Sequence, residues 1–153
     1  SFPTRRSSDL FKIPCIGCEL QRSGQIPVDS TSLRSTLASL NRGVKVLEAG
    51  MPLVIFPEGG RSPDGRLQSF LSGPAYMAIR AQVPVVPMAL VGTRELMPMH
   101  TYHLRPRPLL LLVGAPISTA GYTSKMADDL TARIRDTISG MYSRDLDPAA
   151  KAP

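Results

Sequence analysis

The fold of this chain is decided by the stretch Leu53-Val54-Ile55-Phe56-Pro57-Glu58-Gly59-Gly60-Arg61-Ser62. Val54, Ile55 and Phe56 are β-branched or aromatic, and this apolar run predicts a strand buried on both faces. Pro57 has no N–H group for a sheet ladder and therefore ends the strand. The glycine pair that follows permits backbone angles that other residues resist, and it leaves room for a ligand to approach the main chain.

The residues after this strand suit the binding of an anion. Arg61 offers a planar guanidinium with fixed N–H donors, and Ser62 offers a hydroxyl. A glycine turn at the carboxyl edge of a sheet also presents backbone N–H groups to a ligand. The local sequence leaves a second interpretation open, in which the turn is solvated and its arginine contacts only water.

The segment F-P-E-G-G-R-S at residues 56–62 resembles the F-P-E-G-x-R-S block of the glycerolipid acyltransferases, above all the bacterial 1-acylglycerol-3-phosphate acyltransferases. The likeness extends from about Leu10 to Ile138. It implies a single-domain α/β fold like that of glycerol-3-phosphate acyltransferase, with a largely parallel or mixed sheet flanked by helices. It also implies acyl transfer from acyl carrier protein or acyl-CoA to the free hydroxyl of 1-acylglycerol-3-phosphate, giving phosphatidate in phospholipid biosynthesis, with no cofactor and no metal.

The same resemblance implies a role for each residue of the loop. Arg61 is expected to hold the substrate phosphate, aided by backbone N–H groups around Gly59, Gly60 and Ser62. Glu58 is expected to fix the loop, either by pairing with Arg61 or by accepting main-chain hydrogen bonds. An ordinary turn carboxylate is the alternative for Glu58.

A later segment, V-P-V-V-P at residues 83–87, is similar to a further block of the family. In the family this block helps to shape the acyl-binding side of the site. The resemblance therefore implies that Val83, Pro84 and Pro87 shape the acyl site.

Three features of the chain depart from the family pattern. Ser30 and Leu71 stand where the family commonly carries an arginine and a lysine, so two cations near the expected phosphate are lost. The family's catalytic H-x-x-x-x-D motif is also absent, because the residues five positions after His100 and His103 are arginine and proline. We expect both histidines to be loop or surface residues, and the motif to lie in an upstream part of the natural protein. The chain itself is then expected to be inactive.

The ends of the chain have a different composition from its centre. Residues 1–10 lack an initiator Met, and their sequence matches the translation of a sequencing adapter, so we expect them to be an artefact. Residues 11–144 are expected to form an acyltransferase domain that lacks its N-terminal part. Residues 145–153 are expected to form a disordered tail.

The net charge of +6, from 18 Lys and Arg against 12 Asp and Glu, favours anionic partners. Scattered basic residues and an aromatic content of 5% argue against nucleic acid. No stretch is apolar for long enough to span a bilayer. By resemblance, the partners are a lysophospholipid acceptor, an acyl donor and a membrane surface on the cytoplasmic face of the cell membrane. A non-catalytic binder of anionic lipid or phosphate remains the second hypothesis.

Cys15 and Cys18 form a C-x-x-C motif, which also occurs in redox and zinc sites. There is no second cysteine pair, and the two histidines lie far along the chain. We therefore interpret the cysteines as two small buried thiols in an apolar segment.

Hydrophobic periodicity and turn residues predict an alternation of strands and helices. The strands are expected near residues 24–28, 52–57, 84–91 and 108–113. The helices are expected near residues 31–49, 72–82 and 123–142, after a short helix or turn within residues 11–23.

Overall fold

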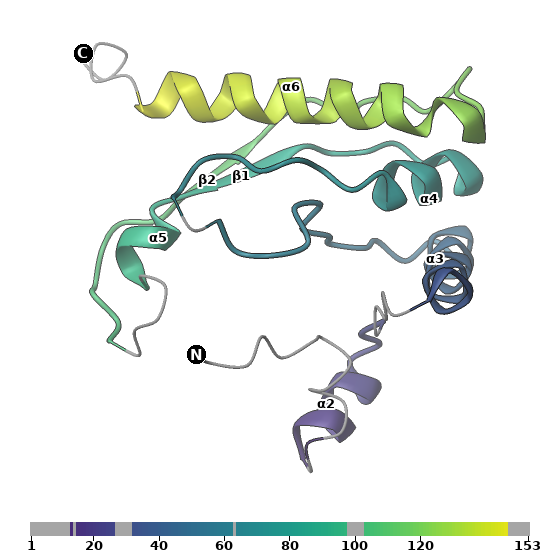
Figure 1. Ribbon diagram of the computed structural model, residues 1–153, viewed down its shortest axis with the longest axis horizontal. Helices are drawn as coiled ribbons and strands as arrows, with labels where there is room; N and C mark the ends of the chain where they lie inside the picture. Colours follow the sequence, from purple (N-terminus) through teal and green to yellow (C-terminus); the bar gives the residue numbers. More distant parts are fainter. Residues whose placement is uncertain (1–12, 14, 27–31, 63, 98–102, 147–153) are drawn as a thin grey trace. The chain divides into compact units, whose positions relative to one another are not determined.

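The computed structural model describes residues 13, 15–26, 32–62, 64–97 and 103–146. The chain divides into two compact units, residues 1–53 and 54–153. Figure 1 shows the helices and strands of the chain. The predicted adapter segment 1–10 lies outside the described residues, and so do residues 147–153 of the predicted tail.

The first unit contains two helices, α2 (Ile16–Arg22) and α3 (Leu33–Glu48). Cys15 and Cys18 at α2 are free thiols and both are exposed, so the prediction that they are buried is wrong. The neighbouring Ile16 is itself 49% exposed. A helix of two turns carries too little apolar surface to enclose a thiol.

Helix α3 confirms the helix predicted near residues 31–49. Its first turn is capped by Ser32, whose extended backbone lets the side chain accept the N–H of Ser35 at 3.1 Å. Its end is set by Gly50, which adopts φ +79° and donates its N–H to the carbonyl of Leu47. Val44 is buried, whereas Leu33 is 77% exposed, so the apolar side chains of this helix are only partly covered.

Two of the predicted strands are not formed in the part of the chain that the structure describes. Residues 24–26 turn the chain after α2, with φ +73° at Gly24, and residues 27 and 28 lie outside the described residues. In the second unit, Val54 and Phe56 are 79% and 77% exposed, so the prediction of a strand buried on both faces is also wrong. An apolar run becomes a buried strand only beside a partner, and residues 52–57 pair with no strand in the described part of the chain.

The core of the second unit forms where α6 (Ala127–Leu146) packs on α4 (Gly73–Ala81) and on strand β1 (Met88–Val91). Figure 1 shows α6 lying along α4 and the strand pair. Leu130, Ile134 and Ile138 recur every four residues and are buried, so this side of the helix faces the core. The helix continues to Leu146, so the first two residues of the predicted tail are helical.

Helix α4 confirms the helix predicted near residues 72–82. Pro74 lies in its first turn, where a missing N–H group costs little. Gln82 ends the helix in the left-handed region at φ +53° and donates its N–H to the carbonyl of Ile79. Ala75 and Ile79 on its inner face are buried against α6.

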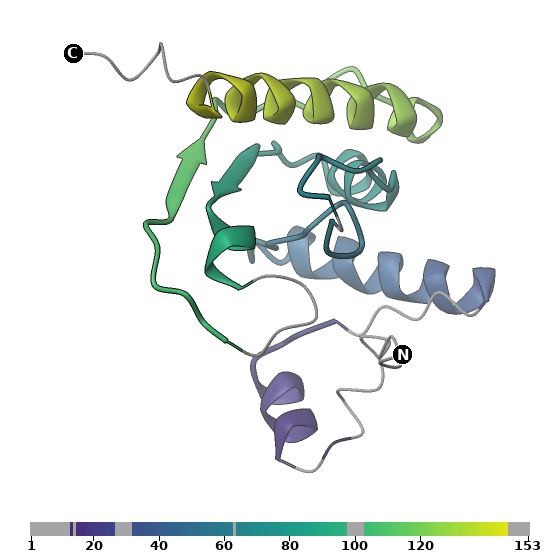
Figure 2. The same ribbon diagram turned by 60° about the vertical axis from the view of Figure 1, so that its left-hand side comes forward.

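Strand β1 pairs antiparallel with β2 (Leu110–Val113), and Figure 2 shows the two strands. In the register of this pair, Ala89 lies opposite Leu112. Ala89 is buried and its neighbours Met88 and Leu90 are more than 40% exposed, as expected when one face of a strand pair is covered. The sheet was expected to be largely parallel or mixed. In the part of the chain that the structure describes, the one ladder is antiparallel.

Prolines shorten the strand that was predicted near residues 84–91. Pro84 and Pro87 have no N–H group, so they interrupt the ladder between them. Val85 instead forms an isolated bridge with Ile117, and the continuous strand begins only at Met88. Pro87 contributes its carbonyl, which accepts the N–H of Gly114 at 2.9 Å.

Short helices complete the second unit. Helix α5 (Thr93–Leu96) follows β1 after Gly92, and the 3-10 helix η1 (Ser124–Met126) precedes α6. Within the described ranges, no helix combines the length and the apolar character needed to cross a bilayer.

Leu130 has no exposed surface and lies at the centre of this core. Replacing it with alanine leaves a cavity, so Leu130→Ala is expected to lower the free energy of unfolding by about 3 kcal/mol. The matched control is Leu104→Ala, because Leu104 is 67% exposed, and its effect is expected to stay within about 0.5 kcal/mol. Urea denaturation of the purified protein measures both, and equal effects would contradict this account of the core.

Thr119 is 2% exposed and its hydroxyl donates to the carbonyl of Val83 at 3.1 Å. Thr119→Val keeps the shape but leaves this carbonyl unsatisfied, so a loss of about 1–3 kcal/mol in unfolding free energy is expected. Thr123→Val is the control, because Thr123 is exposed and its side chain makes no cap hydrogen bond. Thermal denaturation compares the two variants; a Thr119→Val protein as stable as the control would show that the buried hydroxyl contributes nothing.

Candidate functional site

The candidate site is the glycine loop, defined as residues 57–68 except residue 63, which lies outside the described residues. The base of the loop is closed by the N–H of Leu71, which donates to the carbonyl of Pro57 at 2.8 Å. Gly59 has φ +67°, and a Cβ atom there would lie 3.0 Å from Cδ1 of Leu71. The positive φ therefore favours glycine at this position, and a larger residue would also require the exposed Leu71 side chain to shift slightly.

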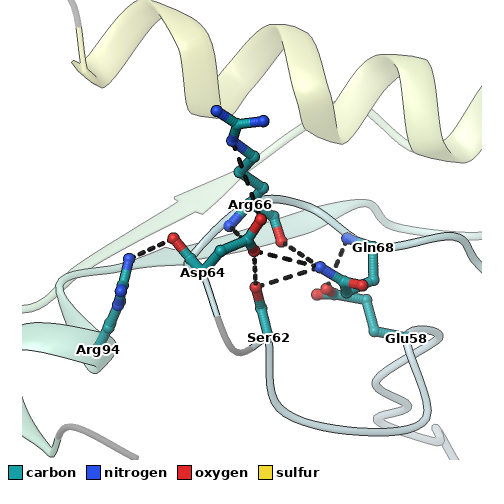
Figure 3. Close-up of polar contacts among 6 residues, drawn as sticks. All are labelled: Glu58, Ser62, Asp64, Arg66, Gln68 and Arg94. Atoms are coloured by element: carbon teal, nitrogen blue, oxygen red, sulfur yellow. Dashed lines mark hydrogen bonds and ion pairs between the residues drawn. The ribbon is translucent and has the colours of Figure 1, made fainter.

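Glu58 fixes the loop from within. Its half-buried side chain accepts the backbone N–H of Gln68 at 2.9 Å through Oε2 (Figure 3). Of the two fixing roles that the sequence left open, main-chain hydrogen bonding is therefore the one observed. A carboxylate that accepts an N–H group forms a charge-assisted bond, stronger than a neutral one.

Asp64 organises the tip of the loop. Its Oδ1 atom accepts the hydroxyl of Ser62 at 2.9 Å and the backbone N–H of Arg66 at 3.0 Å (Figure 3). These two donors, the backbone N–H first, hold the pKa of Asp64 below its usual value. The Ser62 hydroxyl also accepts a bond from the amide of Gln68 at 3.3 Å. The hydroxyl proton of Ser62 is thus directed to Asp64. Within the described residues the backbone N–H of Ser62 has no backbone acceptor, so this N–H is the donor of Ser62 that remains for a ligand.

The backbone donors of the glycine pair differ from each other. The N–H of Gly59 donates to the carbonyl of Phe56 at 3.2 Å and so belongs to the turn. In the described ranges the N–H groups of Gly60 and Ser62 have no such bond, and no atom of a described residue other than Gly60 and its two chain neighbours lies within 4 Å of the Cβ position of Gly60. The open side of the loop is therefore at Gly60.

Arg61 extends from the loop towards the end of α5. Its Nη2 atom donates to the carbonyl of Met97 at 2.6 Å, and the side chain is exposed. A guanidinium has five N–H groups, so four remain after this bond. Its described partner is a neutral carbonyl, which leaves the positive charge of Arg61 uncompensated within the described residues.

A second arginine also joins α5 to the loop, but here the donor lies on α5 and the acceptor lies in the loop. Nη1 of Arg94, on α5, donates to the carbonyl of Asp64 (Figure 3). Arg66 also lies in the loop, where its Nε atom is 3.9 Å from Oδ2 of Asp64. The Arg66 side chain is 89% exposed. Such an exposed pair contributes little to stability.

The three residues expected to shape an acyl site do not share one environment. Pro87 is fully buried, Val83 is half-buried and accepts the Thr119 hydroxyl, and Pro84 is exposed. The three residues are neighbours along one segment, but their different burial shows that their side chains do not face the same side of that segment. An open depression of about 370 Å³ lies elsewhere, between the segment after the glycine loop and α6. It is lined by Ser69, Phe70, Asp128, Thr131, Ala132 and Arg135.

Sequence reasoning missed Asp64, Gln68 and Arg94. The S-P-D-G sequence around Asp64 is typical of a turn in which an aspartate accepts the N–H two residues on, so this residue carried a local signal. Arg94 carried none, because its contact spans 30 positions of the chain. Of the earlier candidates, His103 is exposed, while His100 and Ser30 lie outside the described residues.

Known proteins resemble this chain over most of its length. It is 33% identical over 141 residues to the 1-acyl-sn-glycerol-3-phosphate acyltransferase of Limnanthes alba, covering 92% of this chain and 48% of that protein. It is 28% identical over 129 residues to the enzyme of the same name from Borreliella burgdorferi, covering 84% and 52%. The chain thus spans about half the length of the curated relatives that it matches.

A solved structure matches the fold. The crystal structure of the 1-acyl-sn-glycerophosphate acyltransferase PlsC from Thermotoga maritima superposes with a TM-score of 0.75 at 25% identity, covering 93% of this chain and 56% of that one. This likeness confirms the expected acyltransferase type of α/β fold. The acyltransferase family model matches residues 6–91, which include the glycine loop and β1, and the chain therefore belongs to the acyltransferase family.

Proposed function

We propose that this chain is part of an enzyme that transfers an acyl group to the free hydroxyl of 1-acylglycerol-3-phosphate and so forms phosphatidate. The observation that carries the proposal is the exposed guanidinium of Arg61, which is held at a neutral carbonyl beside the open side of a glycine loop. Relatives that carry the name of this activity support the choice of reaction.

In this proposal the glycine loop binds the phosphate of the acceptor. Arg61 supplies several N–H donors and a full positive charge, and the N–H groups of Gly60 and Ser62 add neutral donors. Glu58 and Gly59 act indirectly, because the first fixes the loop through Gln68 and the second allows its turn. A phosphate bound here would hold the glycerol hydroxyl at a fixed distance from the loop.

Acyl transfer from a thioester also needs a base that removes the proton of the attacking hydroxyl, and donors that stabilise the resulting oxyanion. In the family the base is the histidine of the H-x-x-x-x-D motif, which the 153 residues do not contain. We therefore assign substrate binding, and not the base, to this chain, and expect no acyl transfer from the chain alone.

The remaining parts of the proposal concern the lipid. The acyl donor is acyl carrier protein or acyl-CoA, and the chain works at the cytoplasmic face of the membrane, where its net charge of +6 favours anionic headgroups. The acyl site is shaped by Val83, Pro84 and Pro87, of which Pro87, with its fully buried side chain, acts by supporting the segment from within. The strand pair belongs to a mixed sheet. The antiparallel pairing of β1 with β2 is compatible with such a sheet.

A second function is favoured by the same missing motif. Without a base, and with Ser30 and Leu71 in place of cations, the protein would be a binder of anionic lipid or phosphate. The two functions are separated by incubating the natural full-length protein with lysophosphatidate and each acyl donor. Formation of phosphatidate supports the enzyme; binding without any transfer supports the binder.

Arg61→Ala is expected to weaken lysophosphatidate binding by at least about tenfold, since a charge-assisted hydrogen bond is lost. Arg61→Lys keeps the charge but loses the fork of donors, so an intermediate loss is expected. Isothermal titration below the micelle concentration of the lipid measures both variants.

The matched control is a monoacylglycerol with the same acyl chain and no phosphate. Its affinity is expected to be the same for the parent protein and for Arg61→Ala. Equal losses for the two lipids would show that Arg61 does not recognise the phosphate, and the loop would then be the solvated turn that the sequence left open.

A further inference from the structure

We propose that Arg94 is a positioning residue that fixes the glycine loop so that Arg61 faces the acceptor phosphate. This inference rests on the proposed function, because it assigns to α5 the task of holding a loop whose ligand is phosphate. The two elements are linked by a reciprocal pair of hydrogen bonds, one from each arginine to a carbonyl of the other element.

The first hydrogen bond of the pair joins the Arg94 side chain to the backbone of Asp64. The Arg94 guanidinium donates to the Asp64 carbonyl, and the side chain lies directly on Gly65. A Cβ atom at Gly65 would be 2.9 Å from Cδ of Arg94, and Gly65 has φ +80°. Gly65 therefore both turns the loop and makes room for the arginine.

The second hydrogen bond of the pair joins the Arg61 side chain to the backbone of Met97. The bond of 2.6 Å joins the loop to the residue that follows α5. Carbonyls at the end of a helix have no partner within the helix, so they are available to such a donor. The two bonds run in opposite directions between the same elements, which restricts the sliding of the loop along α5.

This arrangement has a consequence for phosphate binding. A free arginine side chain loses considerable rotamer entropy when it is immobilised on a ligand. Arg94 already holds the loop, and the Met97 carbonyl already holds the Arg61 guanidinium. Much of the entropy cost of immobilising Arg61 is therefore incurred when the protein folds, and not when the phosphate binds. Arg94 then raises phosphate affinity without contacting the phosphate.

The test compares Arg94→Ala with Arg66→Ala in the complete chain. Both remove one positive charge beside Asp64, but Arg66 is 89% exposed and makes no bond to α5. Arg94→Ala is expected to weaken binding of 1-oleoyl-lysophosphatidate about fivefold. Arg94→Lys is expected to recover part of the affinity, and Arg66→Ala to stay within about twofold, since exposed charges contribute little.

Hydrogen exchange adds a readout of the loop itself. Arg94→Ala is expected to speed amide exchange in residues 58–68 while leaving residues 127–142 of α6 unchanged. If α6 also exchanges faster, the variant has lost its fold, and Arg94→Lys then becomes the variant compared with Arg66→Ala.

The double variant Arg61→Ala/Arg94→Ala identifies the route of the effect. If Arg94 acts through Arg61, the double variant binds lysophosphatidate no more weakly than Arg61→Ala alone. Additive losses, or an Arg94→Ala protein that binds like the parent while Arg61→Ala does not, overturn the positioning role and leave the proposed function standing. An Arg61→Ala protein that binds like the parent overturns the phosphate site, and the positioning role with it.

Discussion

The base of the glycine loop is closed by a main-chain to side-chain hydrogen bond, from the N–H of Gln68 to the carboxylate of Glu58. This bond spans ten positions, so it removes much of the freedom of the intervening chain. The half-buried position of Glu58 strengthens the bond, because fewer waters compete for the carboxylate. Together with the pairing of Leu71 and Pro57, it gives the tip of the loop a fixed base.

The charges of the loop are arranged around that base in a particular way. Asp64 directs its carboxylate at the Ser62 hydroxyl and the N–H of Arg66, both inside the loop. Arg61, in contrast, contacts the carbonyl of Met97. The negative charge is thus satisfied internally, whereas the positive charge of Arg61 stays available to a ligand.

The sequence predicted those elements whose signals are local. A helix stop at Gly50 and apolar residues at helical spacing are signals that lie within a few neighbouring residues, and α3, α4 and α6 were predicted from such signals. The strands depended on partners. Val54 and Phe56 have strand-forming side chains, yet they remain exposed because a ladder needs a second segment that local sequence does not specify.

The same distinction applies to the candidate site. The turn at Gly59 was predicted from residue type, and the accepting role of Glu58 was one of the alternatives that the sequence left open. The contact of Arg94 with Asp64 joins residues 30 positions apart and was not predicted. Position 71 shows why a departure from the family pattern leaves the loop intact. Leu71 holds the loop through its backbone N–H, and its side chain is 62% exposed. A leucine in place of the family's lysine removes a charge without disturbing the hydrogen bond, so in the proposed phosphate site the positive charge would come mainly from Arg61.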